Sequence, residues 1–320
     1  MKNLILKFLS LSLAMIMLLC VGTACNENNK NTHTYEETWS YDATYHYKKA
    51  TCEHTNEVKD KSEHNMNGNA CTVCDYLAES KGLKYSLDEY GYSYCVKHVG
   101  ACTDAHVVIP SMYDGSLVTS IEGAAFYGCE WLTGVTLGRH IWKIGNYAFR
   151  DCVKLKKVNY MGTIDEWVKI EFSTLFSNPL CYSGNLYIKN ELITEANITT
   201  ATKIGEYAFS GCDGITSVMI GNSVTSIGYQ AFYGCDSLTS VVIGDSVTSI
   251  RYQAFYGCDS LTTIYYSGTA EDWDNILISS GNSLLNDATR YYYVENESDL
   301  PADNGNYWHY DESGNPVIWE

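Results

Sequence analysis

The sequence predicts a β-rich solenoid built from turns of 23 residues. Three observations support this: an Ala-Phe motif recurs, a cysteine follows it at a constant distance, and an alternating apolar pattern follows the cysteine. Five copies are separated by 23, 60, 23 and 23 residues, so the period is regular apart from one insertion. Their phenylalanines are Phe126, Phe149, Phe209, Phe232 and Phe255.

Each copy contains two short extended segments joined by turns. Leu238, Val241 and Ile243 have the spacing LxxLxL, which places three apolar side chains on one face of a strand. Val247 and Ile250 predict a second short strand, and the Ala-Phe motif between strands predicts a helical or 3₁₀ turn. One copy cannot bury its apolar face, whereas stacked copies share a continuous core.

Cysteine occupies the same position in all five copies. Five equivalent positions in a stacked array do not pair off, so we expect buried thiols there rather than disulfides. Glycines that follow the Ala-Phe motif and the LxxLxL segment are expected at turns. The repeated cysteines are Cys129, Cys152, Cys212, Cys235 and Cys258.

A longer unit follows each run of copies. Residues 160–167 and 266–273 share a Tyr-x-Gly-Thr motif followed by a tryptophan, at an offset of 106 residues. Since a solenoid needs atypical ends, we interpret both as capping units. We expect the solenoid at residues 83–268, with an antiparallel hairpin at its start and a capping insertion at 160–200. A C-terminal capping unit is expected at 269–320.

The frame V-T-S-I…A-F-x-G-C-x-S-L-T-S-V-x-I, matched best from Val224 to Ile264, resembles the BspA-type leucine-rich repeat family of bacterial surface proteins. The resemblance covers residues 105–268 apart from the insertion. It implies a β-rich leucine-rich-repeat solenoid with short helical or 3₁₀ turns. It also implies surface display and a role in adhesion or protein binding, without a particular set of ligand residues.

Residues 1–24 have the features of an export signal, because Lys2 and Lys7 precede an apolar run too short for a membrane span. The residues around Cys25 resemble a bacterial lipobox, so we expect lipid anchoring there, with 25–37 as a flexible linker. Ordinary cleavage after Ala24 is the alternative, since small residues also suit it. We therefore expect export to the cell surface, with membrane contact only through the N-terminal lipid.

Residues 38–80 form a small module rich in cysteine and histidine. Cys71 and Cys74 form a Cys-x-x-Cys pair, and upstream Cys52 and His64 complete zinc-ribbon spacing. The sequence predicts a structural zinc ion in residues 52–74 bound by these four side chains, with His54 as the alternate ligand. Such a short module buries little core, so a metal can supply its folding energy. Disulfides are the alternative, although three cysteines leave one unpaired.

The composition excludes some functions. A net charge of -17 opposes binding to a phosphate backbone, so we expect no nucleic-acid partner. HExxH, GxSxG and phosphate-binding glycine motifs are absent, and no catalytic residue is assigned. We expect a surface protein that binds a protein or glycan ligand. The alternatives are an accessory domain of an extracellular enzyme, an unrecognised extracellular enzyme, or a structural surface spacer.

The residues between the apolar positions of LxxLxL predict the ligand-binding face, because their side chains project away from the core. The last such position varies between copies, as either recognition or neutral drift would produce, whereas the first is mostly threonine. The variable residues are Thr136, Asn159, Met219, Val242 and Tyr265. A second candidate stripe, which packing between turns also explains, contains Tyr127, Tyr233 and Tyr256.

Overall fold

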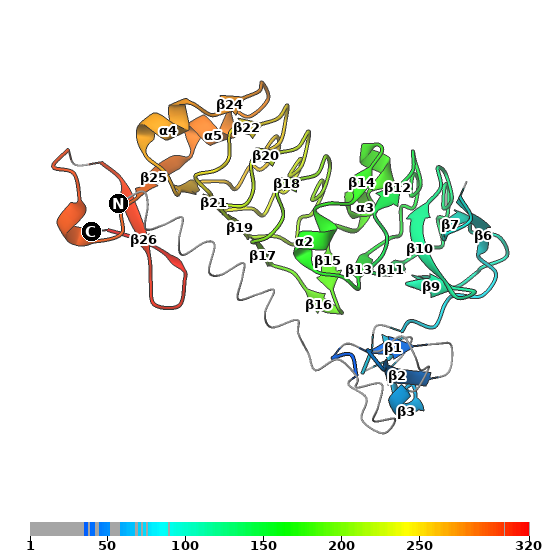
Figure 1. Cartoon of the computed structure of the whole chain (residues 1–320). Helices are drawn as coiled ribbons and strands as arrows, with labels where there is room; N and C mark the ends of the chain where they lie inside the picture. The colour runs from blue at the N-terminus through cyan, green and yellow to red at the C-terminus, as the bar shows by residue number, and fades with distance from the viewer. Residues whose placement is uncertain are drawn as a thin grey trace, which may run out of the picture. The chain divides into compact units, whose positions relative to one another are not determined.

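The computed structural model describes residues 35–37, 39–41, 45–51, 58–67, 70–71, 73–74, 76–88, 90–303 and 305–319. The chain divides into two compact units, residues 1–76 and 77–320 (Figure 1). The predicted export signal, Cys25, Cys52 and His54 lie outside the described residues. No helix in the described part of the chain is long and apolar enough to cross a bilayer.

The first unit contains a small antiparallel sheet and a separate hairpin. Strand β2 pairs with β1 and with β3, and β4 pairs with β5. All six residues of β3 are exposed, and only His46 and Cys71 are buried among the residues of this unit whose burial is described. An apolar core is therefore not what holds these described strands together. Their bounds are β1 Ser40–Tyr41, β2 Tyr45–Lys49, β3 Val58–Glu63, β4 Met66–Asn67 and β5 Ala70–Cys71.

The second unit begins with a run of repeats that forms two mainly parallel sheets. The LxxLxL strands of consecutive copies pair in one sheet and the V-T-S-I strands in the other, so each turn adds a strand to both. The predicted hairpin, β6 with β7, precedes the first copy. The LxxLxL sheet contains β8 (His106–Ile109), β11 (Gly134–Leu137), β13 (Lys157–Tyr160), β15 (Leu186–Ile188) and β16 (Glu191–Leu192). The other sheet contains β6 (Lys84–Leu87), β7 (Ser93–His98), β9 (Met112–Tyr113), β10 (Ser116–Ile121), β12 (Lys143–Ile144) and β14 (Glu171–Phe172).

A second run repeats this arrangement but starts a new LxxLxL sheet. The first such sheet ends at β16, and the next begins at β17 (Figure 1). The new sheet contains β17 (Glu195–Ile198), β19 (Ser217–Ile220), β21 (Ser240–Ile243), β23 (Thr263–Tyr266), β25 (Thr289–Tyr293), β26 (Tyr307–Tyr310) and β27 (Pro316–Ile318). Its companion contains β18 (Lys203–Ile204), β20 (Ser226–Ile227), β22 (Ser249–Ile250) and β24 (Leu277–Ile278).

The repeated phenylalanines form the centre of the core. The ring of Phe232 stacks between those of Phe209 and Phe255, with centroids 5.1 Å away on each side. Phe126 and Phe149 stack in the same way at 5.2 Å, and all five rings are fully buried. The predicted β-rich repeat fold is confirmed, with each copy contributing one ring to a continuous stack within its run.

The five repeated cysteines are buried, and the thiols of Cys152, Cys235 and Cys258 also donate hydrogen bonds. The Cys235 thiol donates to the carbonyl oxygen of Phe209 at 3.1 Å, and that of Cys258 to Phe232 at the same distance. Each thiol therefore contacts the anchor phenylalanine of the preceding turn. The position is not only a small apolar filler, because it also satisfies a buried carbonyl group.

The turn at the Ala-Phe motif consists of single hydrogen-bonded turns and is not a helix. The Cys235 N–H donates to the carbonyl of Phe232 at 3.2 Å, three residues back. Gln230 and Gly234 have φ angles of 51° and 67°, and this left-handed backbone prevents a helix from continuing. Glycine is required at position 244 for a steric reason, because a Cβ there would lie 2.8 Å from the backbone of the neighbouring turn.

The short helices belong mainly to the two capping units. Thr163 and Glu166 form a capping box at the start of α2, as Thr269 and Asp272 do for α4. The indole of Trp167 donates to Ala208 in the second run at 2.8 Å, so the internal unit joins the two runs. The helices are α2 (Ile164–Trp167), η1 (Leu175–Ser177), α3 (Leu180–Ser183), α4 (Ala270–Asp274), α5 (Leu284–Asp287) and η2 (Glu297–Asp299).

Candidate functional site

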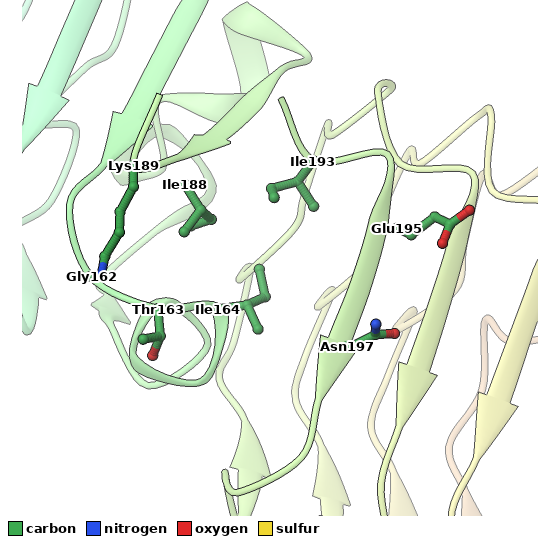
Figure 2. Close-up of a pocket in the computed structure, with 8 residues that line it drawn as sticks. All are labelled: Gly162, Thr163, Ile164, Ile188, Lys189, Ile193, Glu195 and Asn197. Atoms are coloured by element: carbon green, nitrogen blue, oxygen red, sulfur yellow. The ribbon is translucent and has the colours of Figure 1, made fainter. Parts of the chain in front are cut away.

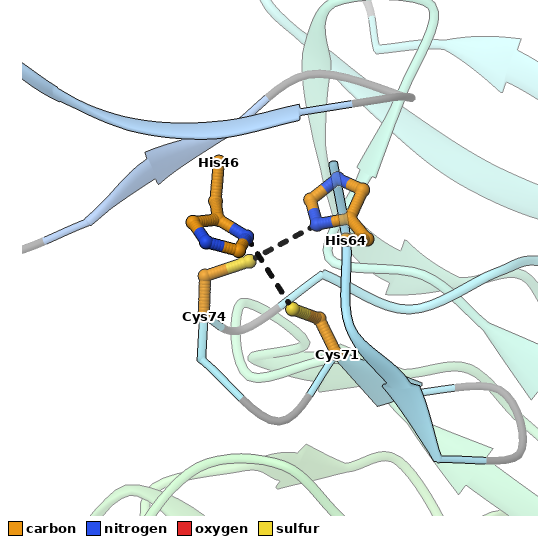
Figure 3. Close-up of side chains that lie close together, drawn as sticks. All are labelled: His46, His64, Cys71 and Cys74. Atoms are coloured by element: carbon orange, nitrogen blue, oxygen red, sulfur yellow. Dashed lines mark hydrogen bonds between the residues drawn. The ribbon is translucent and has the colours of Figure 1, made fainter. Parts of the chain in front are cut away.

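Four potential metal ligands converge in the first unit (Figure 3). His46 lies in β2, His64 follows β3, Cys71 ends β5, and Cys74 lies in the following turn. Their ligand atoms all lie within 4.8 Å of one another. Sγ of Cys71 is 3.7 Å from Nδ1 of His46, and Sγ of Cys74 is 3.5 Å from Nδ1 of His64.

Three of the ligands predicted from sequence therefore meet, and the structure adds His46. Sequence reasoning missed this histidine because it lies 25 residues before Cys71 and on a different strand. Its signal was the alternating Tyr45-His46-Tyr47 segment, in which only the central side chain is buried. The parts of Cys52 and His54 stay predictions, since both lie outside the described residues.

The surroundings of the cluster orient its rings and thiols. Oγ of Ser62 lies 2.8 Å from Nε2 of His46, on the far side of the ring from Cys71. The ring of His64 stacks on Tyr76 with centroids 4.0 Å apart. Burial raises the pKa of Cys71, but hydrogen bonds from the backbone of Val73 and Cys74 and from the side chains of His64 and Cys74 lower it to about 6. A thiolate, the form that binds metals, is therefore accessible near neutral pH.

The variable positions of the LxxLxL strands line up across each sheet. Thr136 is the register partner of Asn159 in the first sheet. In the second sheet, Met219 is the partner of Val242, and Val242 of Tyr265. The structure therefore places the predicted binding residues in two columns, separated where the LxxLxL sheet is interrupted.

The first column is closed to ligands. Thr136 and Asn159 are buried, with exposures of 6% and 1%. The hairpin turn after β15 covers Asn159, because the N–H of Asn190 donates to its side-chain oxygen at 2.8 Å. The side chain of His106 forms a hydrogen bond with Thr136, with Nε2 2.8 Å from the threonine hydroxyl. These two residues therefore have structural partners in place of an external one.

The second column remains partly open. Val242 is buried at 5% exposure because it lies between two larger register partners, Met219 and Tyr265. Met219 and Tyr265 are themselves half-buried. Asn197 and Tyr291 extend the column at its two ends. We call the residues Asn197, Met219, Val242, Tyr265 and Tyr291 the strand face.

The threonine position of LxxLxL has a structural role. The hydroxyl of Thr239 donates to the carbonyl of Thr216 at 3.0 Å, and that of Thr262 donates to Thr239 at 3.4 Å. These bonds connect each turn to the preceding one along the edge of the stack. They explain why this position repeats, whereas the strand face is under no such constraint.

A pocket of about 310 Å³ lies where the LxxLxL sheet is interrupted (Figure 2). Ile164, Ile188 and Ile193 are half-buried and turn toward the same space. The pocket is thus apolar at its centre and lies at the lower end of the size range of ligand pockets. Its remaining lining residues are Gly162, Thr163, Lys189, Glu195 and Asn197.

Strand β17 borders this pocket; among the described strands it pairs with β19 alone, and helix α2 packs close to it. The carbonyl of Ile198 accepts from Gly221 next to β19 at 2.8 Å, so alternate residues of β17 face that strand. Glu195 and Asn197 therefore direct their backbone groups toward the pocket.

The side chains of the tyrosine stripe pack between turns and are also partly exposed to solvent. Tyr233 and Tyr256 stack on each other with centroids 5.3 Å apart, which is the packing between turns expected as one alternative. Tyr256 and Tyr127 still expose about half of their surface, 48% and 52%. Tyr233 and Tyr256 provide a comparison for the strand face, because they belong to the same turns as Val242 and Tyr265.

The acidic residues of the capping units have structural partners. The carboxylate of Asp165 accepts hydrogen bonds from the backbone of Thr199, Thr200 and Ala201 at 2.8–3.1 Å. Glu166 completes the capping box of α2 and pairs with Arg139 at 3.1 Å. Thr-x-x-Glu and Thr-x-x-Asp were the sequence signals for these caps. Neither carboxylate is held in a catalytic pair.

A model of the BspA-type leucine-rich repeat region matches residues 105–203 and 184–286 of the chain in six copies. A solved leucine-rich repeat protein of T. pallidum is 25% identical, with 58% of this chain and 69% of that chain covered and a TM-score of 0.34. One from Bacteroides ovatus is 20% identical, with coverage of 71% and 74% and a TM-score of 0.29. A leucine-rich cell surface protein of Faecalibacterium prausnitzii is 16% identical, with coverage of 63% and 97% and a TM-score of 0.19. Among curated proteins, no match to this sequence was found.

Proposed function

Because the chain belongs to the BspA-type leucine-rich repeat family, we propose that it is an exported cell-surface protein whose solenoid binds another protein. The main support for the proposal is the strand face. Its residue type differs from copy to copy, and its large side chains are partly exposed to solvent. Met219 and Tyr265 are half-buried on this face, and the pocket begins beside Asn197 at its end.

The chemistry of the face favours a protein over a glycan. Met219 and the three isoleucines of the pocket offer apolar surface, which suits apolar side chains of a protein partner. Tyr265 and Tyr291 stack with centroids 5.7 Å apart, so each ring covers one face of the other, and Trp308 lies 5.4 Å from Tyr265. A sugar ring would need an open aromatic face, whereas a protein can use ring edges and hydroxyls.

The binding mode that we propose starts from the pocket beside β17. A segment of the partner lies over this pocket, next to Glu195 and Asn197. One apolar side chain of that segment fills the pocket against Ile188 and Ile193. The rest of the partner then lies across Met219 and Tyr265.

The proposal includes an N-terminal lipid at Cys25 and a zinc ion in the first unit. The export signal and lipobox-like residues support the first, and the Cys/His cluster supports the second. The zinc has a structural role, because four protein ligands leave no open coordination position for catalysis. The lipid would hold the protein at the surface while the solenoid binds its partner.

A saturable binding assay against panels of extracellular matrix proteins and glycans tests the function. Met219→Asp combined with Tyr265→Ala should abolish protein binding and leave the circular-dichroism melt nearly unchanged. The matched control is Tyr233→Ala with Tyr256→Ala, which removes two aromatic rings from the turns of Val242 and Tyr265 and should keep binding. Loss of binding in the control alone would move the site to the tyrosine stripe. Saturable binding to glycans only would contradict a protein partner.

A further inference from the structure

We propose that one zinc ion is bound by His46, His64, Cys71 and Cys74, and that it joins the β1–β3 sheet to the β4–β5 hairpin. This inference rests on the zinc of the proposed function. It adds which residues bind the ion and what binding does to the fold. In particular, it assigns to His46 the position that spacing alone gives to Cys52.

The separations in the cluster match a tetrahedral site. Zinc bonds of about 2.3 Å to sulfur and about 2.0–2.1 Å to nitrogen place S and N ligands of one ion about 3.6 Å apart. The two thiol–imidazole distances are 3.7 Å and 3.5 Å, one on either side of that value. The same distances suit hydrogen bonds in the metal-free unit, so the ion can enter without large movement of its ligands.

The donor set selects zinc among common ions. Two imidazole nitrogens and two thiol sulfurs are soft or borderline donors, which calcium and magnesium avoid. The N–H of Val73 points at Sγ of Cys71 from 3.4 Å, as expected in a Cys-x-x-Cys turn that presents both sulfurs to one ion. His46 and Cys71 are buried, and His64 and Cys74 are half-buried, so water has limited access to the site.

Outer partners hold both imidazoles in position. Nδ1 of His46 faces Cys71, while Nε2 lies 2.8 Å from the hydroxyl of Ser62. Histidines that bind metals commonly donate their second N–H to such a partner, which fixes the tautomer. Trp39 meets the His46 ring edge to face at 4.8 Å, and Tyr76 stacks on His64 at 4.0 Å.

The ion would also stabilise the first unit, whose described residues form no apolar core. His46 and Cys71 are its only buried side chains among those whose burial is described, and both belong to the cluster. The centre of the unit is therefore polar, and no apolar cluster of described residues replaces it. Small units of this kind commonly fold with their metal, because the binding free energy becomes folding free energy.

The full chain, purified without chelator and with a mild reductant, provides the test. Native mass spectrometry and elemental analysis should find one zinc per chain in the wild type and in Cys52→Ser. His46→Ala should lose the ion, and His46→Cys should regain it. Ser62→Ala should keep one zinc with affinity lowered about 10–100-fold, as for other outer partners of metal-binding histidines. His98→Ala, which removes an exposed histidine of the second unit, should change nothing.

The outcomes separate the two levels of the proposal. A wild type that binds no zinc, or in which peptide mapping finds a disulfide between Cys71 and Cys74, would overturn the zinc itself. One zinc that survives His46→Ala but is lost in Cys52→Ser would overturn the ligand assignment only. Cobalt(II) substitution in the wild type removes any dependence on variants that fail to fold. Its thiolate charge-transfer bands should correspond to two sulfur ligands, and three would place Cys52 in the site.

Discussion

Replacing Phe232 with alanine should strongly destabilise the solenoid. The side chain is fully buried and stacks on Phe209 and Phe255 at 5.1 Å on each side. Phe→Ala changes in cores cost about 3–5 kcal/mol. Phe126 has a neighbouring ring of this stack on one side only, so its replacement should cost less by about 0.5–1.5 kcal/mol, the value of one aromatic pair.

Urea unfolding followed by circular dichroism measures this difference. The control is Tyr256→Ala, which removes a ring of similar size in the adjacent position of a neighbouring turn, where 48% of the surface is exposed. Its expected cost is about 1 kcal/mol or less, because little buried surface and one stacking contact are lost. A Phe232→Ala protein as stable as the Tyr256→Ala protein would refute the stacked core.

Two further predictions concern the capping unit and the anchor. Burial raises the pKa of Asp165, but backbone N–H groups of Ala201 and Thr200 and the Thr199 hydroxyl outweigh it and hold that pKa below its ordinary value. Asp165→Asn should therefore cost about 1 kcal/mol or less near neutral pH, because solvent screens this partly exposed carboxylate, and the difference should vanish as the pH falls below about 4 through the lowered pKa. A difference that persists unchanged at pH 2 in denaturation curves would contradict this role. For the anchor, metabolic labelling with a fatty acid should mark the wild type and not Cys25→Ala; equal labelling of both would reject lipidation.

The repeat could be predicted from sequence because its signals are local and occur five times. The Phe and Cys positions and the LxxLxL strands all lie within one 23-residue copy, and parallel stacking follows from the period. The conformation of the turn at Gln230 could not be predicted from sequence, because a non-glycine residue with a left-handed backbone leaves no clear sequence signal. Gly244 was recognised as a turn residue, but its reason, the approach of a neighbouring turn, needs the stacked structure.

The sites depended on contacts that sequence does not reveal. His46 joins the cluster of potential metal ligands through strand pairing, and no spacing rule connects it to the Cys-x-x-Cys pair. Asn159 varies like a recognition residue, yet the hairpin turn at Asn190 covers it. The pocket exists because the LxxLxL sheet stops at β16 and restarts at β17, an interruption inside a segment that was interpreted only as a cap.

The most direct test of protein binding by the strand face is site-specific photo-crosslinking. A photoreactive phenylalanine analogue at Tyr265 reports contacts on the strand face. The same analogue at Tyr256, nine residues earlier in the same turn, reports contacts on the tyrosine stripe. The account predicts a crosslinked protein from position 265 that an excess of unlabelled wild type competes away, and none from position 256. Competed crosslinks from position 256 alone would contradict it.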